Sequence, residues 1–201
     1  SAGRRIDVPL TLVVSVLGRV PDAKKIVAKE FKRTGNKLML VGKVDPTVLG
    51  GSVYADGFGQ RGNTLFDAND GASIKALWDA LLRAHTQGAY ASASAIAEGG
   101  VMLRVFEASY GSGLGARISL DLSMEGRRDG LLFGEFIGSV LLEVASQREL
   151  AGIWAGIPHA VIGEVTADAR LVLTERDKIV WQDTTSNLAE AWSSTFEEVV
   201  K

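Results

Sequence analysis

The sequence predicts an α/β protein of the α+β kind, in which a mixed β-sheet is flanked by helices. Short apolar runs rich in β-branched residues recur along the chain, and segments with helical 3–4 spacing lie between them. The chain has 201 residues, of which 46% are hydrophobic and 23% are charged. This length and composition allow a substantial core in one large domain or two small ones. The alternation of the two patterns indicates a sheet with helices packed on it.

The first third of the chain contains two strand patterns and a long glycine-rich loop. The run from Leu10 to Val20 is short, apolar and β-branched, which is typical of a buried strand. A basic segment follows it as a loop or short helix. A second strand is expected over Lys37–Gly42, and Gly50–Gly62 is expected to be a loop with one helical turn at Ser52–Ala55.

Two helices are expected in the middle of the chain. The clearer one spans Asp70–Gln87, with Ser73 as its N-cap. Its expected buried face is Ile74, Leu77, Trp78, Leu81 and Leu82. The second helix spans Ala97–Tyr110, and its expected buried face is Met102, Val105, Phe106 and Tyr110.

The last third of the chain returns to strands and closes on a helix. Strands are expected over Ala116–Leu122 and Ser139–Val144, with a short helix capped by Ser146 after them. Three short strands then follow in HAVIGEVT, ARLVLTE and KIVWQD, the last two joined by a turn at Arg176–Asp177. The closing helix carries an apolar stripe of Leu188, Trp192, Phe196 and Val199.

Charge and composition exclude several classes of function. The net charge is −2, with 22 basic and 24 acidic residues, so the basic surplus of a nucleic-acid-binding protein is missing. The chain has no cysteine, which excludes disulfides, thiolate nucleophiles and cysteine–zinc sites and fits a cytoplasmic protein. The two histidines, His85 and His159, lack matching ligands nearby in the sequence, and we assign them structural roles. No apolar run approaches the roughly 20 residues that span a bilayer.

Three glycine-containing motifs have the composition of ligand loops. In YGSGLG (Tyr110–Gly115) the order is helix, glycines, strand, the reverse of a dinucleotide fingerprint, so this motif predicts a plain helix-to-strand connection. In LGGSVYADG, Gly50 and Gly51 allow the backbone to approach a ligand, and Ser52 can cap a helical turn or donate to an anion. A turn that only packs closely against a neighbouring segment explains this second motif equally well.

The third motif, AEGG, begins a helix whose free N–H groups can hold phosphate. Glu98 can instead cap those groups, which we favour, or bind a cation. Glu135 lies in an otherwise apolar run, where an unpaired carboxylate is costly to bury. It either pairs with Arg127 or Arg128 or faces a cleft, and the sequence leaves both alternatives open.

Several of these pieces, in this order, resemble one known family. VSVLGRVPDAKK, KLMLVG, LGGSVYADGFGQRGN, AEGGVMLRVFEASYGSGLGARISLDL, LLFGEFIGSVLLEV and AVIGEVT are similar to the C-terminal half of the aminoimidazole ribonucleotide (AIR) synthetase superfamily. Within the superfamily, the likeness is greatest to the second such half of the phosphoribosylformylglycinamidine synthases. It covers roughly residues 5–198 of the chain.

The resemblance implies a fragment of a larger purine-biosynthetic ligase. Such enzymes use ATP, magnesium and glutamine-derived ammonia to convert formylglycinamide ribonucleotide to the amidine. The implied division is 1–34, the last strand and connector of an N-terminal ATP-binding domain, and 35–201, the AIR synthase-related C-terminal domain. The implied partners are that ATP-binding domain, the sister half of the synthetase and a glutaminase. Without them the chain is expected to be inactive, to bind no cofactor by itself and to expose its first strand for self-association.

The family motif His-Asp-x-Ser-Asp-Gly-Gly corresponds to SAIAEGG in this chain. The histidine and first aspartate fall on Ser94 and Ala95, the serine on Ala97 and the second aspartate on Glu98. The polar groups are therefore mostly lost, which implies a structural half-site or one that has lost its ligand. We expect neither catalytic nor metal-binding residues, and the expected substrate or nucleotide contacts are Gly50, Gly51, Ser52, Tyr54, Glu98, Gly99, Gly100 and Glu135. The alternatives are a non-catalytic scaffold or another superfamily member resembling thiamine-monophosphate kinase, selenide synthetase or a hydrogenase-maturation protein.

Overall fold

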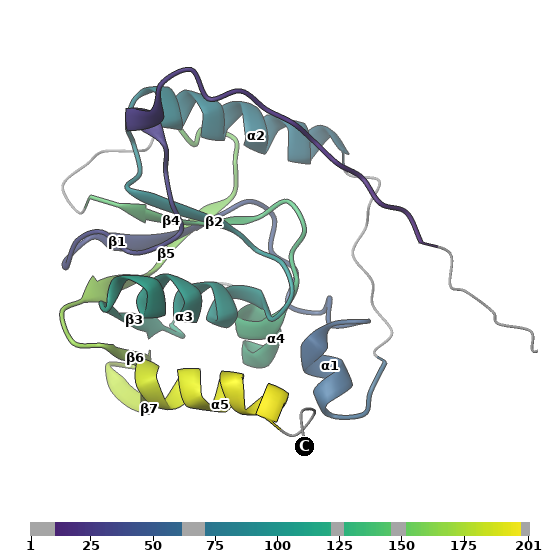
Figure 1. Cartoon of the computed structure of the whole chain (residues 1–201), viewed down its shortest axis with the longest axis vertical. Coiled ribbons are helices and arrows are strands. Elements are labelled where there is room, and N and C mark those ends of the chain that lie inside the picture. Colours follow the sequence, from purple (N-terminus) through teal and green to yellow (C-terminus); the bar gives the residue numbers. More distant parts are fainter. Residues whose placement is uncertain (1–10, 62–70, 122–126, 146–151, 198–201) are drawn as a thin grey trace, which may run out of the picture.

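The structure is a computed structural model that describes residues 11–61, 71–121, 127–145 and 152–197. It contains one seven-stranded sheet in the order β2-β4-β1-β5-β3-β6-β7, with helices on both faces (Figure 1). The strands are β1 (Lys37–Val41), β2 (Ser92–Ala95), β3 (Gly115–Ser119), β4 (Val140–Val144), β5 (His159–Thr166), β6 (Arg170–Glu175) and β7 (Lys178–Thr184). The helices are η1 (Ala23–Lys25), α1 (Val53–Gly57), α2 (Gly71–Thr86), α3 (Gly100–Ser112), α4 (Arg128–Phe133) and α5 (Thr185–Glu197).

The sheet is mixed, as the sequence predicted. β3 and β6 run parallel, and the other neighbouring strands run antiparallel. The turn at Arg176–Asp177 joins β6 to β7 with positive φ at both residues, as tight hairpins require. The α+β fold class is therefore confirmed.

Central strand β1 is buried on both faces because its side chains alternate between two cores. Leu38 and Leu40 pack in the core beneath α3 and α5, while Met39 and Val41 pack in the core beneath α2. The α2 core also contains Trp154, whose side chain is fully buried. Continuous apolar runs are expected of strands that are covered on both faces.

Helix α2 confirms the clearest helix prediction but corrects its cap and its buried face. The helix begins at Gly71, so Ser73 lies in its first turn and is not the N-cap. Trp78 and Leu82 are 52% and 67% exposed. The buried side of α2 is only a narrow stripe, made of Leu77, Ala80, Leu81 and Ala84.

Helix α3 starts three residues later than predicted, at Gly100, and its inner face is buried as expected except for exposed Tyr110. Gly113 ends the helix in the left-handed conformation, and β3 begins at Gly115. The YGSGLG motif is therefore a helix-to-strand connection, as predicted. In α5, Leu188 is half-buried and Trp192 is 57% exposed, while the predicted stripe residues Phe196 and Val199 lie outside the described side chains.

The buried strand predicted over Leu10–Val20 is wrong for the described part of the chain. Residues 11–20 form no strand, and Leu12, Val16 and Leu17 are at least 86% exposed. A strand needs a neighbouring ladder for its N–H and C=O groups, and none of the described strands pairs with this segment. The expected exposure is confirmed, and the expected self-association stays a prediction. The short helix expected after Ser146 falls mostly outside the described residues.

Buried Glu143 fastens the basic segment before β1 to the sheet. Its side chain, on β4, is 1% exposed. The carboxylate accepts hydrogen bonds from the backbone N–H groups of Lys32 (2.8 Å) and Arg33 (2.9 Å) and from Asn36 Nδ2 (2.7 Å). Three N–H donors compensate the burial of this carboxylate.

Candidate functional site

The two loops singled out from the sequence meet at one carboxylate. Glu135 follows α4, and its Oε1 accepts hydrogen bonds from Val53 N at 2.9 Å and from Gly99 N at 3.1 Å. Val53 begins α1 in the Gly50–Tyr54 loop, and Gly99 is the N-cap residue of α3. The two donors lie 82 and 36 positions before Glu135 in the sequence, and the fold brings both to the same oxygen.

Neither sequence-based alternative for Glu135 gave its partners. Arg127 pairs with Asp129, and Arg128 pairs with Glu175. Glu135 binds backbone donors instead of a guanidinium group. Both arginines lie close to Glu135 in sequence, eight and seven positions before it, but their side chains contact Asp129 and Glu175.

The predicted capping role of Glu98 is also corrected. The N-cap residue Gly99 provides no side chain, and Glu135 rather than Glu98 accepts its N–H. Glu98 is exposed, and its backbone carbonyl accepts a hydrogen bond from Arg104 Nη2 at 3.1 Å. The positions that carry histidine and aspartate in the family motif, Ser94 and Ala95, are the last two residues of β2.

The Gly99–Gly100 pair is required by the close approach of α3 to α4. Both residues have positive φ, of 74° and 67°. A Cβ on Gly100 would lie 2.6 Å from the Cα of Phe133, a backbone atom that cannot move aside cheaply. Glycine is thus needed here for conformation and for space.

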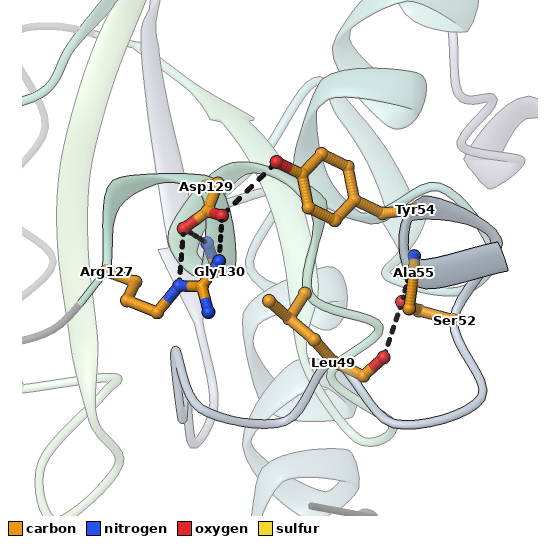
Figure 2. A network of polar contacts seen from close by, with 7 residues as sticks. All are labelled: Leu49, Ser52, Tyr54, Ala55, Arg127, Asp129 and Gly130. Atoms are coloured by element: carbon orange, nitrogen blue, oxygen red, sulfur yellow. Dashed lines mark hydrogen bonds and ion pairs between the residues drawn. The ribbon is translucent and has the colours of Figure 1, made fainter. Parts of the chain in front are cut away.

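The Ser52–Tyr54 segment is held by its own hydrogen bonds (Figure 2). Ser52 Oγ donates to the Leu49 carbonyl at 2.8 Å and accepts from Ala55 N at 3.1 Å, which makes it the N-cap of α1 as predicted. Tyr54 donates to Asp129 Oδ2 at 3.2 Å. Its ring stacks on Phe133 with 4.8 Å between centroids. Within the same loop, Gly51 N donates to the Arg61 carbonyl at 2.8 Å, while Gly50 is half-buried.

Asp129 organises the far side of this loop. Its carboxylate accepts from both Arg127 Nε and Arg127 Nη2, from Gly130 N and from Tyr54, as Figure 2 shows. The Arg127 hydrogen bond is the main cause that lowers the pKa of Asp129 below its usual value of 3.8. Burial is the main cause that raises the pKa of Tyr54, with the Asp129 contact second.

We expect Asp129→Asn to remove a pH-dependent part of the stability. The folded pKa lies below the unfolded one, so the stabilisation is complete above pH 3.8 and is lost as pH falls through the folded value. At pH 7 the free energy of unfolding, measured with urea, should be only slightly higher for the wild type than for the variant, because Arg127 is exposed and its charge is screened by solvent. The difference should shrink progressively as the pH is lowered below 3.8. A difference that stays constant over this pH range would contradict this assignment.

An apolar groove of about 590 Å³ opens beside the two loops. Three of the candidate residues, Tyr54, Glu98 and Gly99, line it. Five aromatic side chains contribute to its walls: Tyr54, Phe106, Phe133, Trp181 and Trp192. Among the described residues that line the groove, Glu98 alone is charged, so the groove favours an apolar or aromatic body over an anion.

A second cavity, of about 220 Å³, lies beside α2. Gly42, Lys43, Asp45 and Ser73 are among its lining residues, and none of the eight candidate residues lines it. The loops predicted from the sequence therefore belong to the groove on the α3–α5 side of the sheet.

Sequence reasoning missed part of the site. Asp129 and Phe133 lie on α4, a helix that the sequence does not predict because RRDG has the composition of a turn. The spacing of Arg127 and Asp129 could have indicated a local ion pair. The aromatic contribution of Trp181 from β7 carried no local signal. Over the described ranges, no three His, Asp or Glu side chains gather where they could hold a metal ion, and no helix is long and apolar enough to cross a membrane.

Two curated proteins to which the chain is similar carry the same name. The chain is 31% identical, over 214 aligned positions, to the phosphoribosylformylglycinamidine synthase subunit PurL of Synechocystis, covering 100% of the chain and 27% of that protein. It is 36% identical over 160 positions to the subunit of the same name from Symbiobacterium thermophilum, covering 74% of the chain and 20% of the relative. The chain thus spans about a quarter of the length of these relatives.

Solved structures share the fold. Thermotoga maritima PurL complexed with FGAR matches 83% of this chain and 30% of its own with a TM-score of 0.69 at 19% identity. The complex of the same protein with ATP gives a TM-score of 0.65 at 20% identity. E. coli HypE, a hydrogenase maturation protein, gives 0.57 at 16% identity over 79% of this chain and 51% of its own.

The family comparison covers most of the sheet. The family described as AIR synthase related protein, C-terminal domain, matches residues 33–176, from the segment fastened by Glu143 to the end of β6. This range includes both loops, Glu135 and α4. The chain therefore belongs to the AIR synthase-related C-terminal domain family.

Proposed function

We propose that the chain is the C-terminal domain of one synthetase half in a ligase of the phosphoribosylformylglycinamidine synthase type. The whole enzyme would use ATP, magnesium and glutamine-derived ammonia in the cytoplasm to convert formylglycinamide ribonucleotide to the amidine. This domain would supply one wall of the substrate cleft and position the ligand. The observation that carries the proposal is the 31% identity, over the whole chain, to a phosphoribosylformylglycinamidine synthase subunit. The two loops that carry the proposed contacts both donate to Glu135.

The proposed ligand contacts follow from the same loops. Gly50, Gly51, Gly99 and Gly100 would bring backbone close to the ligand, with Ser52, Tyr54 and Glu98 beside them. For Glu135, no hydrogen bond from a described residue reaches Oε2, so this oxygen would serve as the polar anchor for a donor of the ligand.

ATP and magnesium would be held elsewhere in the whole enzyme. Gly99 N is already bonded to Glu135, and Glu98 is the single acid of the AEGG motif, which is too few ligands for magnesium. We propose that residues 1–34 end the preceding ATP-binding domain, that residues 35–201 form the present one, and that the sister half and a glutaminase complete the enzyme. The isolated chain would then have no catalytic activity.

A structural role for this half is the second candidate function. Ser94 and Ala95 stand where the family motif has histidine and aspartate, so this half would carry no titratable group there. The likeness to a hydrogenase maturation protein concerns the fold alone and does not favour a third function.

The proposal is tested with the parent ligase and with the chain alone. In the parent, Tyr54→Ala should lower kcat/KM for formylglycinamide ribonucleotide by about tenfold, because the loop loses its ring stacking. Trp78→Ala is the matched control, since Trp78 is exposed on α2 across the sheet. The chain alone should show no heat of binding with ATP and magnesium. An unchanged kcat/KM in Tyr54→Ala, or micromolar ATP binding by the chain, would refute the proposal.

A further inference from the structure

We propose that Glu135 is a positioning residue that sets the spacing between the Val53 loop and the Gly99 turn through a single oxygen. Oε1 accepts both backbone N–H groups, at 2.9 Å and 3.1 Å. Hydrogen bonds from N–H groups to a carboxylate are about twice as strong as neutral ones. A single acceptor shared by two loops fixes their separation, because movement of either loop lengthens a bond to the same atom.

Glu135 is itself held firmly enough to act as a reference point. It lies between Gly134, whose N–H bonds to the Gly130 carbonyl at the end of α4, and Phe136, whose side chain is 1% exposed in the core. Ile137 N donates to the Glu135 carbonyl at 3.0 Å. The backbone that carries the carboxylate is therefore anchored on both sides.

The arginines on α3 and at the start of α4 pair with groups other than Glu135. Arg127 is engaged by Asp129, and Arg128 by Glu175. Arg104 donates to the Glu98 carbonyl and pairs with Glu107. These pairings leave the Glu135 carboxylate with backbone donors, which report the positions of the two loops directly.

This inference rests on the proposed function only in placing substrate beside the loops. Val53 and Gly99 both line the groove, together with Tyr54 and Glu98. Holding the backbones of Val53 and Gly99 in place therefore also holds the part of the groove wall that these residues form. The same carboxylate would thereby connect three segments that contribute to one cleft.

The chemistry of the single oxygen gives a sharp test in the 201-residue chain. Glu135→Gln keeps Oε1, and the two N–H donors require the amide to present its oxygen to them. Glu135→Asp is shorter by one C–C bond, about 1.5 Å, and cannot reach both donors. Glu135→Ala removes the acceptor. Glu98→Gln is the matched control, because the exposed Glu98 side chain accepts from neither amide.

Hydrogen exchange followed by NMR measures the two amides separately. The Val53 and Gly99 amides should keep their protection in Glu135→Gln and Glu98→Gln and lose it together, by about tenfold or more, in Glu135→Asp and Glu135→Ala. The Ala55 amide, capped by Ser52, should be unaffected. Since Glu135→Asp changes only the reach of the side chain, it tests the proposal even if Glu135→Ala does not fold. Unchanged protection of both amides in Glu135→Asp, or loss in Glu135→Gln, would overturn the proposal.

A second measurement in the parent ligase separates positioning from the proposed anchor role. Glu135→Gln keeps the Oε1 acceptor but replaces Oε2 with an NH₂ group. A raised KM for formylglycinamide ribonucleotide with protected amides would support both roles of Glu135. An unchanged KM with protected amides would support positioning and refute the anchor role alone.

Discussion

Glu143→Ala is expected to lower the free energy of unfolding by about 3–5 kcal/mol, which is a large part of the stability of a typical domain. The substitution leaves the N–H groups of Lys32 and Arg33 and the Asn36 amide without their buried acceptor. A buried donor that loses its partner costs about 1–3 kcal/mol. Urea unfolding, followed by tryptophan fluorescence, measures the loss.

Two controls show whether the loss of stability comes from removing a buried hydrogen-bond acceptor or from removing any carboxylate. Glu164→Ala breaks an ion pair with Lys37 at the surface and should cost less than about 1 kcal/mol. Glu143→Gln should fall between the two, because its oxygen serves some donors while its NH₂ group faces another donor. A loss below about 1 kcal/mol in Glu143→Ala would show that water or a rearranged loop replaces the carboxylate.

Gly100→Ala is expected to cost about 3 kcal/mol, through two separable causes. The left-handed φ of 67° is unfavourable for alanine by about 1–2 kcal/mol. In addition, the new Cβ would meet the backbone of Phe133 at 2.6 Å, which forces α3 and α4 apart. The thermal midpoint and the urea midpoint should both fall.

Gly113→Ala supplies the matched control for this substitution. Gly113 ends the same helix with φ of 72°, but a Cβ there would meet no atom within 4 Å. It should therefore cost only the conformational term, about 1–2 kcal/mol. Equal losses in the two variants would mean that the close approach of α3 to α4 contributes nothing to stability.

The predictable part of the fold was the part with strong local patterns. The apolar run of β1 and the periodic pattern of α2 identified these elements with nearly correct bounds. β2 was missed because SASA contains small residues without a strand pattern, and its strand state depends on pairing with β4. The pattern of α2 overstated its buried face, because Trp78 and Leu82 lie outside the narrow stripe that the helix buries and are more than half exposed.

The candidate site was predicted as a set of residues but not as an arrangement. Glycine patterns in the sequence located both loops, because the positive φ at Gly51, Gly99 and Gly100 favours glycine at these positions. The partners of Glu135 could not be predicted from the sequence, because they are backbone N–H groups, which nearly every residue has. The resemblance in sequence gave the ligase hypothesis, whereas the role of Glu135 is seen only in the three-dimensional structure.

The middle of the sheet has a consequence for synthesis on the ribosome. Strand β1, at residues 37–41, is flanked by β4 at residues 140–144 and β5 at residues 159–166. A nascent chain therefore emerges with β1 unpaired, and 98 further residues (42–139) are synthesised before the first residue of either neighbouring strand. Folding of this kind is slow and leaves apolar surface exposed. Translation that stops before β5 should therefore yield chains that aggregate unless chaperones bind them.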